Sequence, residues 1–382
     1  MSRTEVAVPD GTPYEDVHAG LHSEQGAFRG EHPGRAANPV VKVVDLAWLE
    51  FEKPDLDRAE RFLVDFGFVV ADRTPDELRL RGTWAQGPCL VIRRGPRSRY
   101  VGHAMLAASR SDLDRLARST GGTVEDHRGG HAVRLVDPSG YEVRVVAGVP
   151  ELPALAERAP LTLNFGTTTA RPNVPQRPPR VAAQVQRLGH VALETTRFSA
   201  ALDWYLETLG LIVSDFLFLD DLRDHGPTMA FMRCDQGGTP TDHHTLAMFL
   251  GPRTGYAHSA YQVTDLDAIA TGGEFLREQG YQRVWGIGRH IQGSQIFDYW
   301  RDPDRLMFEH FADGDRFDCS VETGWSPMST SGLAQWGPPV SRDFLGTKPN
   351  PALVAAVLRA LAVDDNDIDP RTLRSLMKAM SA

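Results

Sequence analysis

The sequence predicts a mixed α+β protein of two domains, built from four βαβββ modules that form two half-open barrels. Three observations predict this fold. Several β-rich runs are each followed by an amphipathic helical pattern and then by short strands. Residues 62–72 are similar in sequence to residues 205–215, which indicates an internal duplication. A segment rich in Pro and Arg, residues 151–184, separates the two halves and cannot continue a helix or a central strand.

The first half is expected to form one domain over residues 40–150. Its first module opens with the β-rich run after Val40, and its second module opens at His103. The spacing of apolar residues predicts helices over 56–66 and 111–119 and strands over 78–81, 89–93, 132–136 and 142–146.

The second half repeats this order over residues 185–316. The pattern predicts helices over 199–209 and 266–279 and strands over 188–193, 212–216, 229–233, 245–250 and 306–311. Residues 1–39 are expected to form a mobile N-terminal arm, because they lack a sustained apolar period. Residues 317–382 are expected to form a C-terminal extension with short helices over 351–362 and 370–380.

Composition limits the classes of partner. Of the 382 residues, 41 are Lys or Arg and 50 are Asp or Glu, so the formal net charge is −9. Nucleic acid and anionic membranes are therefore poor partners. Three scattered cysteines without a C-x-x-C pair indicate a reducing compartment, and no apolar stretch suits a membrane span or a signal peptide. We expect a cytoplasmic protein, and a duplicated barrel with a tail commonly forms a homo-oligomer.

Histidines gather in the second half, where seven of the thirteen lie between residues 190 and 310. Three residues stand at comparable strand ends of the repeat: His190, His258 and Glu309. Two imidazoles and one carboxylate leave coordination positions open, which suits Fe(II). Zinc hydrolases use the same set, so the ligand types alone do not choose the metal.

Strand periodicity explains how these three distant residues could meet. In a pair of βαβββ modules, the first strands of both modules and the last strand of the second module line one barrel interior. Glu309 shares a strand face with Met307 and Phe311, whereas His310 points to the other face. A carboxylate buried on such a face costs several kcal/mol unless it is paired or coordinated.

Residues 288–309 read GRHIQGSQIFDYWRDPDRLMFE. This segment resembles the signature of the type I extradiol catechol dioxygenases of the vicinal oxygen chelate superfamily, and the resemblance extends over roughly residues 40–315. It implies the vicinal oxygen chelate fold and meta-cleavage of a catechol, with insertion of both atoms of O2. It implies Fe(II), less often Mn(II), bound by His190, His258 and Glu309. It also implies active-site roles for His244, His290 and Tyr299.

Two positions in this segment depart from the family pattern. Asp298 stands where the family usually has an apolar residue, and strand alternation predicts that it points away from Tyr299. Arg305 replaces the common turn glycine, and we expect the turn to avoid the positive φ that glycine permits. Neither change touches a predicted ligand.

The first half is expected to be a degenerate, non-catalytic copy. Aligning the repeats places Leu46 opposite His190, Arg144 opposite Glu309 and Arg134 opposite Tyr299, and leaves only His103 opposite His258. One histidine cannot hold a catalytic ion.

Ring cleavage needs proton transfer beside the metal, and His244 is the expected acid and base because a free imidazole has a pKa near ~6.5. Its neighbour His243 is the competing candidate, since only one of the two can enter the pocket. His290 could hydrogen-bond a substrate oxygen, and Tyr299 could orient the second catechol proton.

Two other functions stay open. A glyoxalase-like isomerase or lyase would use the same fold and metal but would not need His244, His290 and Tyr299 together. A sequestration protein would bind an aromatic ligand without a metal or turnover. The expected partners are a catechol and O2; a monocyclic or bicyclic substrate, proximal or distal cleavage, and iron or manganese are not decided.

Overall fold

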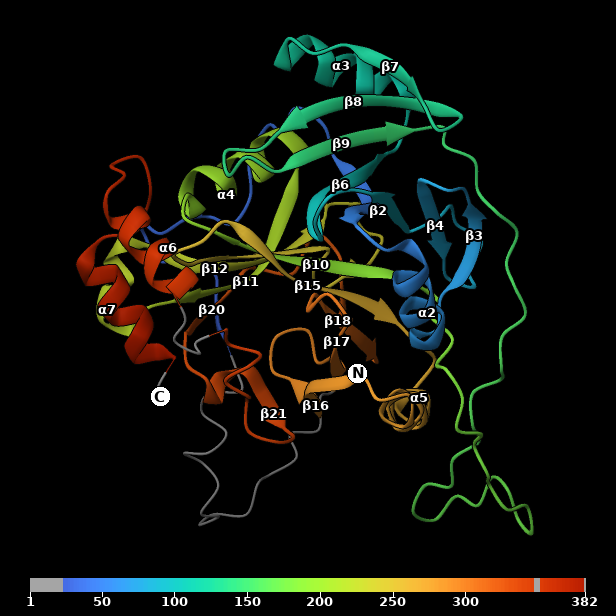
Figure 1. Ribbon diagram of the computed structural model, residues 1–382. Coiled ribbons are helices and arrows are strands. Elements are labelled where there is room, and N and C mark those ends of the chain that lie inside the picture. The colour runs from blue at the N-terminus through green and yellow to red at the C-terminus, as the bar shows by residue number, and fades with distance from the viewer. Residues whose placement is uncertain (1–22, 347–350, 381–382) are drawn as a thin grey trace, which may run out of the picture.

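The structure is a computed structural model in which residues 23–346 and 351–380 are described. Two large sheets organise it (Figure 1). The first sheet has eight strands in the order β3-β4-β5-β2-β6-β9-β8-β7. Their bounds are β2 Val43–Lys53, β3 Val69–Arg73, β4 Glu77–Arg81, β5 Leu90–Arg94, β6 Arg99–Ala107, β7 Val124–His127, β8 Gly130–Val136 and β9 Glu142–Ala147.

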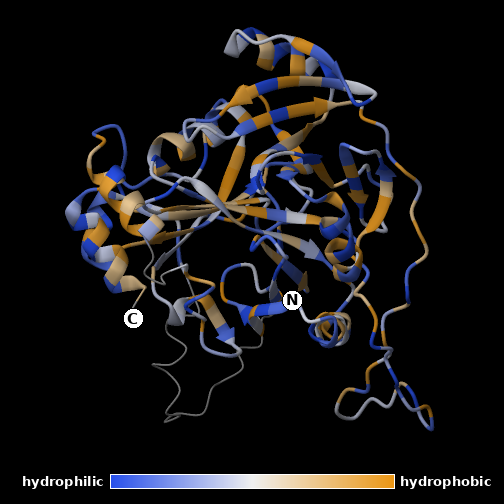
Figure 2. Cartoon of the chain, in the orientation of Figure 1, coloured by the Kyte–Doolittle hydropathy of each residue, from blue (hydrophilic) through white to orange (hydrophobic). Residues whose placement is uncertain are grey.

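The second sheet has eleven strands in the order β1-β20-β11-β12-β14-β10-β15-β18-β17-β16-β21. Its central strands are β10 Arg187–Thr195, β11 Leu211–Phe218, β12 Pro227–Cys234, β14 Leu246–Leu250, β15 Gly255–Gln262, β16 Gln282–His290, β17 Ile296–Arg301 and β18 Met307–Ala312. A separate two-stranded ladder joins β13 Thr241–Asp242 to β19 Arg316–Phe317. Figure 2 shows hydrophobic residues along the strands at the centre of the molecule.

Each sheet contains two βαβββ modules. In the first, β2 pairs in parallel with β5, β6 pairs in parallel with β9, and the antiparallel β2–β6 contact joins the modules. The strands β10, β14, β15 and β18 repeat this arrangement in the second sheet. The predicted fold class, an α+β fold of two domains with four modules, is confirmed.

One helix belongs to each module: α2 Leu56–Phe66, α3 Arg110–Thr120, α4 Phe198–Leu209 and α5 Leu266–Glu278. Helix α2 begins where the Asp55 side chain accepts a hydrogen bond from the Arg58 amide, and it ends at Gly67 with φ +118°. Gly67 also lets the linker approach, because a Cβ there would lie 1.7 Å from the Ala183 carbonyl oxygen.

Aromatic side chains join the two sheets into one continuous core. The Phe62 and Phe66 rings of α2 pack on Phe308 of β18, with ring centroids 5.5 and 5.8 Å apart. The His310 ring stacks on Phe66 at 3.7 Å, and its Nε2 donates a hydrogen bond of 2.7 Å to the Phe66 carbonyl. His310 therefore points to the face opposite Glu309, as alternation predicts. There it packs in the interface between the two sheets.

Both terminal segments extend the second sheet. Strand β1 (Glu24–Gln25) pairs with β20 (Gly324–Pro327), which pairs with β11, and β21 (Ala334–Trp336) pairs with β16 at the opposite edge. Residues 23–39, expected within a mobile arm, instead pack on this sheet, and Arg223 forms ion pairs with Glu24 and Glu31. The rest of the predicted arm, residues 1–22, lies outside the described residues.

The C-terminal extension contains two further helices, α6 (Pro351–Leu361) and α7 (Pro370–Ala379). Helix α7 begins at Asp369, whose side chain accepts a hydrogen bond from the Thr372 amide. Among the described residues, no helix combines the length and apolarity that a membrane span requires.

The turn before β18 differs from the expectation. Arg305 has φ +73°, the left-handed conformation that a glycine would adopt without strain. The surroundings compensate the arginine, because its amide donates to the Asp302 carbonyl and its carbonyl accepts from the Arg301 guanidinium. The expectation that this turn avoids a positive φ is wrong.

A buried ion pair between the domains provides a stability test. The Lys53 ammonium is 1 % exposed and contacts the carboxylates of Asp302 and Asp304. Lys53→Met leaves the buried Asp302 carboxylate without its cation, whereas Asp304 keeps its pair with Arg58, so we expect the free energy of unfolding to fall by about 3–5 kcal/mol in denaturant titrations. The matched control is Lys42→Met, since Lys42 is 53 % exposed in its pair with Asp235 and should cost less than ~1 kcal/mol. Equal losses would contradict this account.

A buried histidine in the first sheet provides a pH test. Burial lowers the pKa of His103 to about 4, so its neutral form contributes stability that is present above the unfolded pKa and is lost as the pH falls. In metal-free protein, the free energy of unfolding of the wild type falls between about pH 7 and pH 5. In His103→Gln this fall should be smaller by about 2 kcal/mol. The control variant is His131→Gln, because the His131 side chain is 38 % exposed and its replacement should change the slope less than that of His103. An unchanged slope in His103→Gln would refute the prediction.

Candidate metal centre and active site

Three adjacent strands bring the predicted ligands together. His190 lies on β10, His258 on β15 and Glu309 on β18, and these strands are neighbours in the order β10-β15-β18. In the sheet register Ala260 pairs with His190 on one side and with Glu309 on the other, and His258 lies two residues before Ala260. Because side chains alternate along a strand, all three point to one face.

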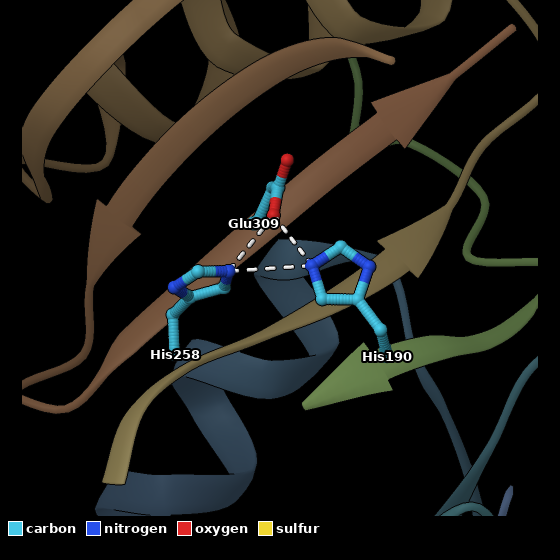
Figure 3. A group of neighbouring side chains, drawn as sticks. All are labelled: His190, His258 and Glu309. Carbon is cyan, nitrogen blue, oxygen red and sulfur yellow. Dashed lines mark hydrogen bonds and ion pairs between the residues drawn. The ribbon is translucent and has the colours of Figure 1, made fainter. Parts of the chain in front are cut away.

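The three side chains converge on one point (Figure 3). The Nε2 atoms of His190 and His258 are 3.3 Å apart, and each lies 3.4 Å from Oε2 of Glu309. One donor atom of each residue lies within 4.8 Å of the others. This spacing could hold a single metal ion.

Electrostatics at this point favour a cation. Glu309 is fully buried, and neither of its carboxylate oxygens has a hydrogen-bond partner among the described residues. Burial lowers the pKa values of His190 and His258 to about 3 and raises the pKa of Glu309. The imidazoles are therefore neutral at physiological pH, with lone pairs available to a metal. A divalent cation would supply the positive charge that compensates the buried carboxylate.

Close packing fixes the ring of His190. Gly189 precedes it where a Cβ would come within 2.3 Å of the Phe311 ring, so glycine at this position lets the Phe311 side chain lie against β10. The His190 and Phe311 rings then lie 5.9 Å apart.

His290 and Tyr299 form a hydrogen-bonded pair beside this centre. Tyr299 pairs with Glu309 in the register of β17 and β18, and its hydroxyl lies 2.8 Å from Nε2 of His290. Nδ1 of His290 lies 2.8 Å from the Leu333 carbonyl, which can only accept. Nδ1 therefore carries the proton, and Nε2 accepts the hydrogen bond of the Tyr299 hydroxyl.

His244 lies in the bend between β13 and β14, with its ring 4.0 Å from the ring of His190. Burial lowers its pKa well below the ordinary value. His243 turns away from this position, and its ring is hydrogen-bonded to Asp215. The two histidines thus occupy different places, and His244 is the one beside the predicted ligands.

Apolar side chains lie beside His244, whose ring is 5.1 Å from the ring of Phe231. Ala192, Leu217, Phe231 and Ala247 form a buried cluster on the interior of the sheet. From the C-terminal extension, Phe344 packs 4.9 Å from the Tyr299 ring. Sequence reasoning missed the contributions of Leu333 and Phe344, because no periodicity links a terminal extension to a particular face.

The first sheet carries a different set of residues at the equivalent point. Ala104 pairs with Trp48 and with Arg144, as Ala260 pairs with His190 and Glu309. By the same register Gly102, not His103, corresponds to His258. The alignments of Leu46 with His190 and of His103 with His258 are therefore wrong, because β-bulges shift the register of β2.

An internal ion pair fills this point of the first sheet. Arg144 Nη1 lies 2.5 Å from Oε1 of Glu50, which also accepts a hydrogen bond of 3.0 Å from Trp48 Nε1. Arg144 does correspond to Glu309, and Arg134 pairs with it as Tyr299 pairs with Glu309. A guanidinium here excludes a divalent cation by charge.

Asp298 behaves as alternation predicts. It pairs with His310, points away from Tyr299 and contacts Arg283, with Oδ1 3.0 Å from Nε. Trp300 Nε1 donates to its other oxygen at 2.8 Å. Burial raises the pKa of Asp298 to about 7. Asp298, which departs from the family pattern, thus lies on the face of β17 opposite Tyr299.

The chain is similar in sequence to known proteins. Residues 187–310 match the model of the Glyoxalase/Bleomycin resistance protein/Dioxygenase superfamily. Metapyrocatechase 2 of Cupriavidus necator is 32% identical over 341 residues, which cover 85% of this chain and 98% of that protein. Biphenyl-2,3-diol 1,2-dioxygenase 3 of Rhodococcus globerulus is 25% identical over 48% of this chain and 88% of its own length.

Solved structures share the fold. The homoprotocatechuate 2,3-dioxygenase of Arthrobacter globiformis superposes with a TM-score of 0.64 at 21% identity, over 82% of this chain and 94% of that chain. The Mn(II)-bound glyoxalase of Novosphingobium aromaticivorans superposes with a TM-score of 0.66 at 22% identity, over 82% of this chain and 97% of that chain. One of these two structures is a dioxygenase and the other is a glyoxalase. The 32% identity over almost the whole metapyrocatechase favours the dioxygenases. This chain belongs to the extradiol dioxygenases of the glyoxalase, bleomycin resistance protein and dioxygenase superfamily.

Proposed function

We propose that the protein cleaves the ring of a catechol next to its vicinal hydroxyl groups, using O2, at a mononuclear metal held by His190, His258 and Glu309. The observation that carries the proposal is the fully buried Glu309 carboxylate, which faces two neutral imidazoles and has no hydrogen-bond partner among the described residues. Three ligands on one side leave coordination positions open for a bidentate diol.

The residues fit Fe(II). Two imidazole nitrogens and one carboxylate are the donor set of non-haem ferrous oxygenases. A bound ferrous ion supplies the one-electron chemistry that lets a catechol react with O2. A related protein of Rhodococcus jostii is named an iron-dependent extradiol dioxygenase, which supports iron, and Mn(II) is the alternative because the ligand set suits both metals.

Tyr299 and His290 orient the substrate in this proposal. With its proton donated to His290 Nε2, the Tyr299 oxygen keeps lone pairs that can accept a hydrogen bond from a catechol hydroxyl. His290 stays in place because Nδ1 donates to the Leu333 carbonyl. The pair fixes one face of the diol without carrying a charge.

His244 is the proposed acid and base. Its ring lies against His190, so a diol bound at the centre would place an oxygen within reach of its free nitrogen. The buried environment keeps His244 neutral before substrate binds, and it can therefore accept a catechol proton.

The substrate is a small catechol in this account, and the apolar cluster of Ala192, Leu217, Phe231 and Ala247 would accommodate its ring. A cytoplasmic location and a homo-oligomer stay as predictions from the sequence.

Oxygen consumption tests the proposed function. Protein prepared anaerobically and loaded with Fe(II) should consume one molecule of O2 per molecule of catechol and form a yellow ring-cleavage product, followed with an oxygen electrode and a spectrophotometer over mono- and bicyclic catechols. Glu309→Ala, and equally His190→Ala or His258→Ala, should lose both the iron and the oxygen uptake. Full activity with bound metal in Glu309→Ala would overturn the ligand assignment.

The same assay separates the alternatives. A glyoxalase-like enzyme would bind metal but would not consume O2 with any catechol. A sequestration protein would bind the aromatic ligand with or without metal, and the ligand would be recovered unchanged.

Removing the proposed acid and base should slow turnover without releasing the metal. His244→Phe keeps the ring volume but removes the nitrogen, so we expect kcat to fall by about 100-fold or more while the iron content stays at the wild-type level. Metal analysis beside oxygen-electrode kinetics measures both. A variant with wild-type kcat would exclude His244 from proton transfer.

A further inference from the structure

A line of hydrogen bonds leads from the proposed acid and base to the carboxylate of Asp215 on β11. Nδ1 of His244 lies 3.0 Å from Nδ1 of His243, and Nε2 of His243 lies 2.7 Å from Oδ2 of Asp215. All three residues are buried. From the sequence, His243 is only the competing candidate to His244, and Asp215 is only the last residue of the repeated segment 205–215.

The acceptor at the end of this line determines where the protons lie. A carboxylate oxygen can only accept, so Nε2 of His243 carries the proton in its hydrogen bond with Asp215. With one proton on each ring, His243 has a lone pair at Nδ1, and the facing nitrogen of His244 donates to it. His244 is therefore protonated at Nδ1, which leaves its Nε2 without a proton.

His243 lies in a closely packed, apolar environment. Its side chain is 1 % exposed and is enclosed by the rings of Phe231 and Phe317, with centroids 5.8 and 5.3 Å away. The backbone at Gly293 also packs against the ring, so closely that a Cβ there would lie 3.1 Å from Cγ of His243.

The two terminal segments hold Asp215 in place. Ser23 Oγ donates to Oδ1 of Asp215 at 2.7 Å and accepts from Ser326 Oγ at 2.9 Å. Gly324 of β20 lies so close that a Cβ there would be 2.0 Å from Oδ1 of Asp215. The two terminal segments thus cover the Asp215 carboxylate. One of its oxygens accepts a hydrogen bond from Ser23, and the other accepts one from His243.

The duplicated half lacks this line. Asp72 is the counterpart of Asp215 in segment 62–72, and its side chain is 52 % exposed in a surface pair with Arg79. The sequence has no histidine between His32 and His103 to place beside it. The line is therefore restricted to the half that carries the predicted ligands.

We propose that Asp215 and His243 are positioning residues that hold His244, whose ring lies 4.0 Å from the ring of His190, in the tautomer with an unprotonated Nε2. The proposal rests on the proposed function. When a catechol hydroxyl gives up its proton, the O–H bond breaks and an N–H bond forms at Nε2 of His244. Nδ1 of His244 keeps its proton and continues to donate it to Nδ1 of His243. The charge of Asp215 stabilises the resulting His244 imidazolium through the His243 ring between them.

Nuclear magnetic resonance of the histidine rings tests the tautomer without any activity. In metal-free wild-type protein with ¹⁵N-labelled histidine, His244 should show a protonated Nδ1 and an unprotonated Nε2, and His243 the opposite arrangement. Signals are assigned by their loss in His243→Phe and His244→Phe. A doubly protonated His243, or His244 protonated at Nε2, would overturn the proposal.

Kinetic variants test the positioning role. His243→Phe removes the acceptor for His244 Nδ1, and we expect kcat to fall by about 10- to 100-fold with KM and iron content little changed. His243→Asn offers an amide oxygen near the lost nitrogen and should restore part of kcat. Asp215→Asn removes the charge, so it should lower kcat and should also disturb the single tautomer of His244.

The control is His103→Phe, which removes another buried imidazole in the first sheet and should leave kcat at the wild-type value. Wild-type kcat in His243→Phe would overturn the positioning role. A wild-type protein with the expected tautomers but no oxygen uptake would refute the proposed reaction, while the tautomers would still support the hydrogen-bond line.

Discussion

Glu309 brings a carboxylate into the interior of the second sheet, where the described residues offer its oxygens no hydrogen bond and two neutral imidazoles face it at 3.4 Å. An isolated, ionised carboxylate costs several kcal/mol at this depth, so its charge must be offset, and a bound cation would do so. Every other feature of the site depends on that requirement. The Tyr299 and His290 pair is neutral, and the surrounding cluster is apolar, so no nearby side chain replaces the missing charge.

The duplicated half shows the other solution to the same constraint. Its interior places a guanidinium at the position of the carboxylate, and Arg144 pairs internally with Glu50. The two halves therefore share a backbone arrangement but not a charge pattern: one is complete without a ligand, and the other is not. The first half supports the second through the aromatic interface of Phe62, Phe66 and Phe308.

Much of this could be predicted from the sequence, because alternation along strands and repetition of modules are local signals. They were sufficient for the βαβββ order, for the opposite faces of Glu309 and His310, and for the orientation of Asp298. The register between strands is not local. Bulges in β2 place Trp48 and Gly102 where sequence alignment placed Leu46 and His103.

Contacts from the terminal segments were also beyond prediction. The Leu333 carbonyl on His290 and the Ser23 hydroxyl on Asp215 connect residues separated by 43 and 192 positions, without a periodic signal. The positive φ of Arg305 depends on hydrogen bonds made by neighbouring residues after folding, which the residue type alone opposes. Such features depend on tertiary structure and follow only from coordinates.

The central claim is that a single ion occupies the point where two imidazoles and one carboxylate meet. Anomalous X-ray diffraction at the iron edge, from crystals of protein loaded anaerobically with Fe(II), tests it most directly. The account predicts one anomalous peak within bonding distance of Nε2 of His190, Nε2 of His258 and a carboxylate oxygen of Glu309. A peak elsewhere, or one that leaves any of these three side chains unbound, would contradict it.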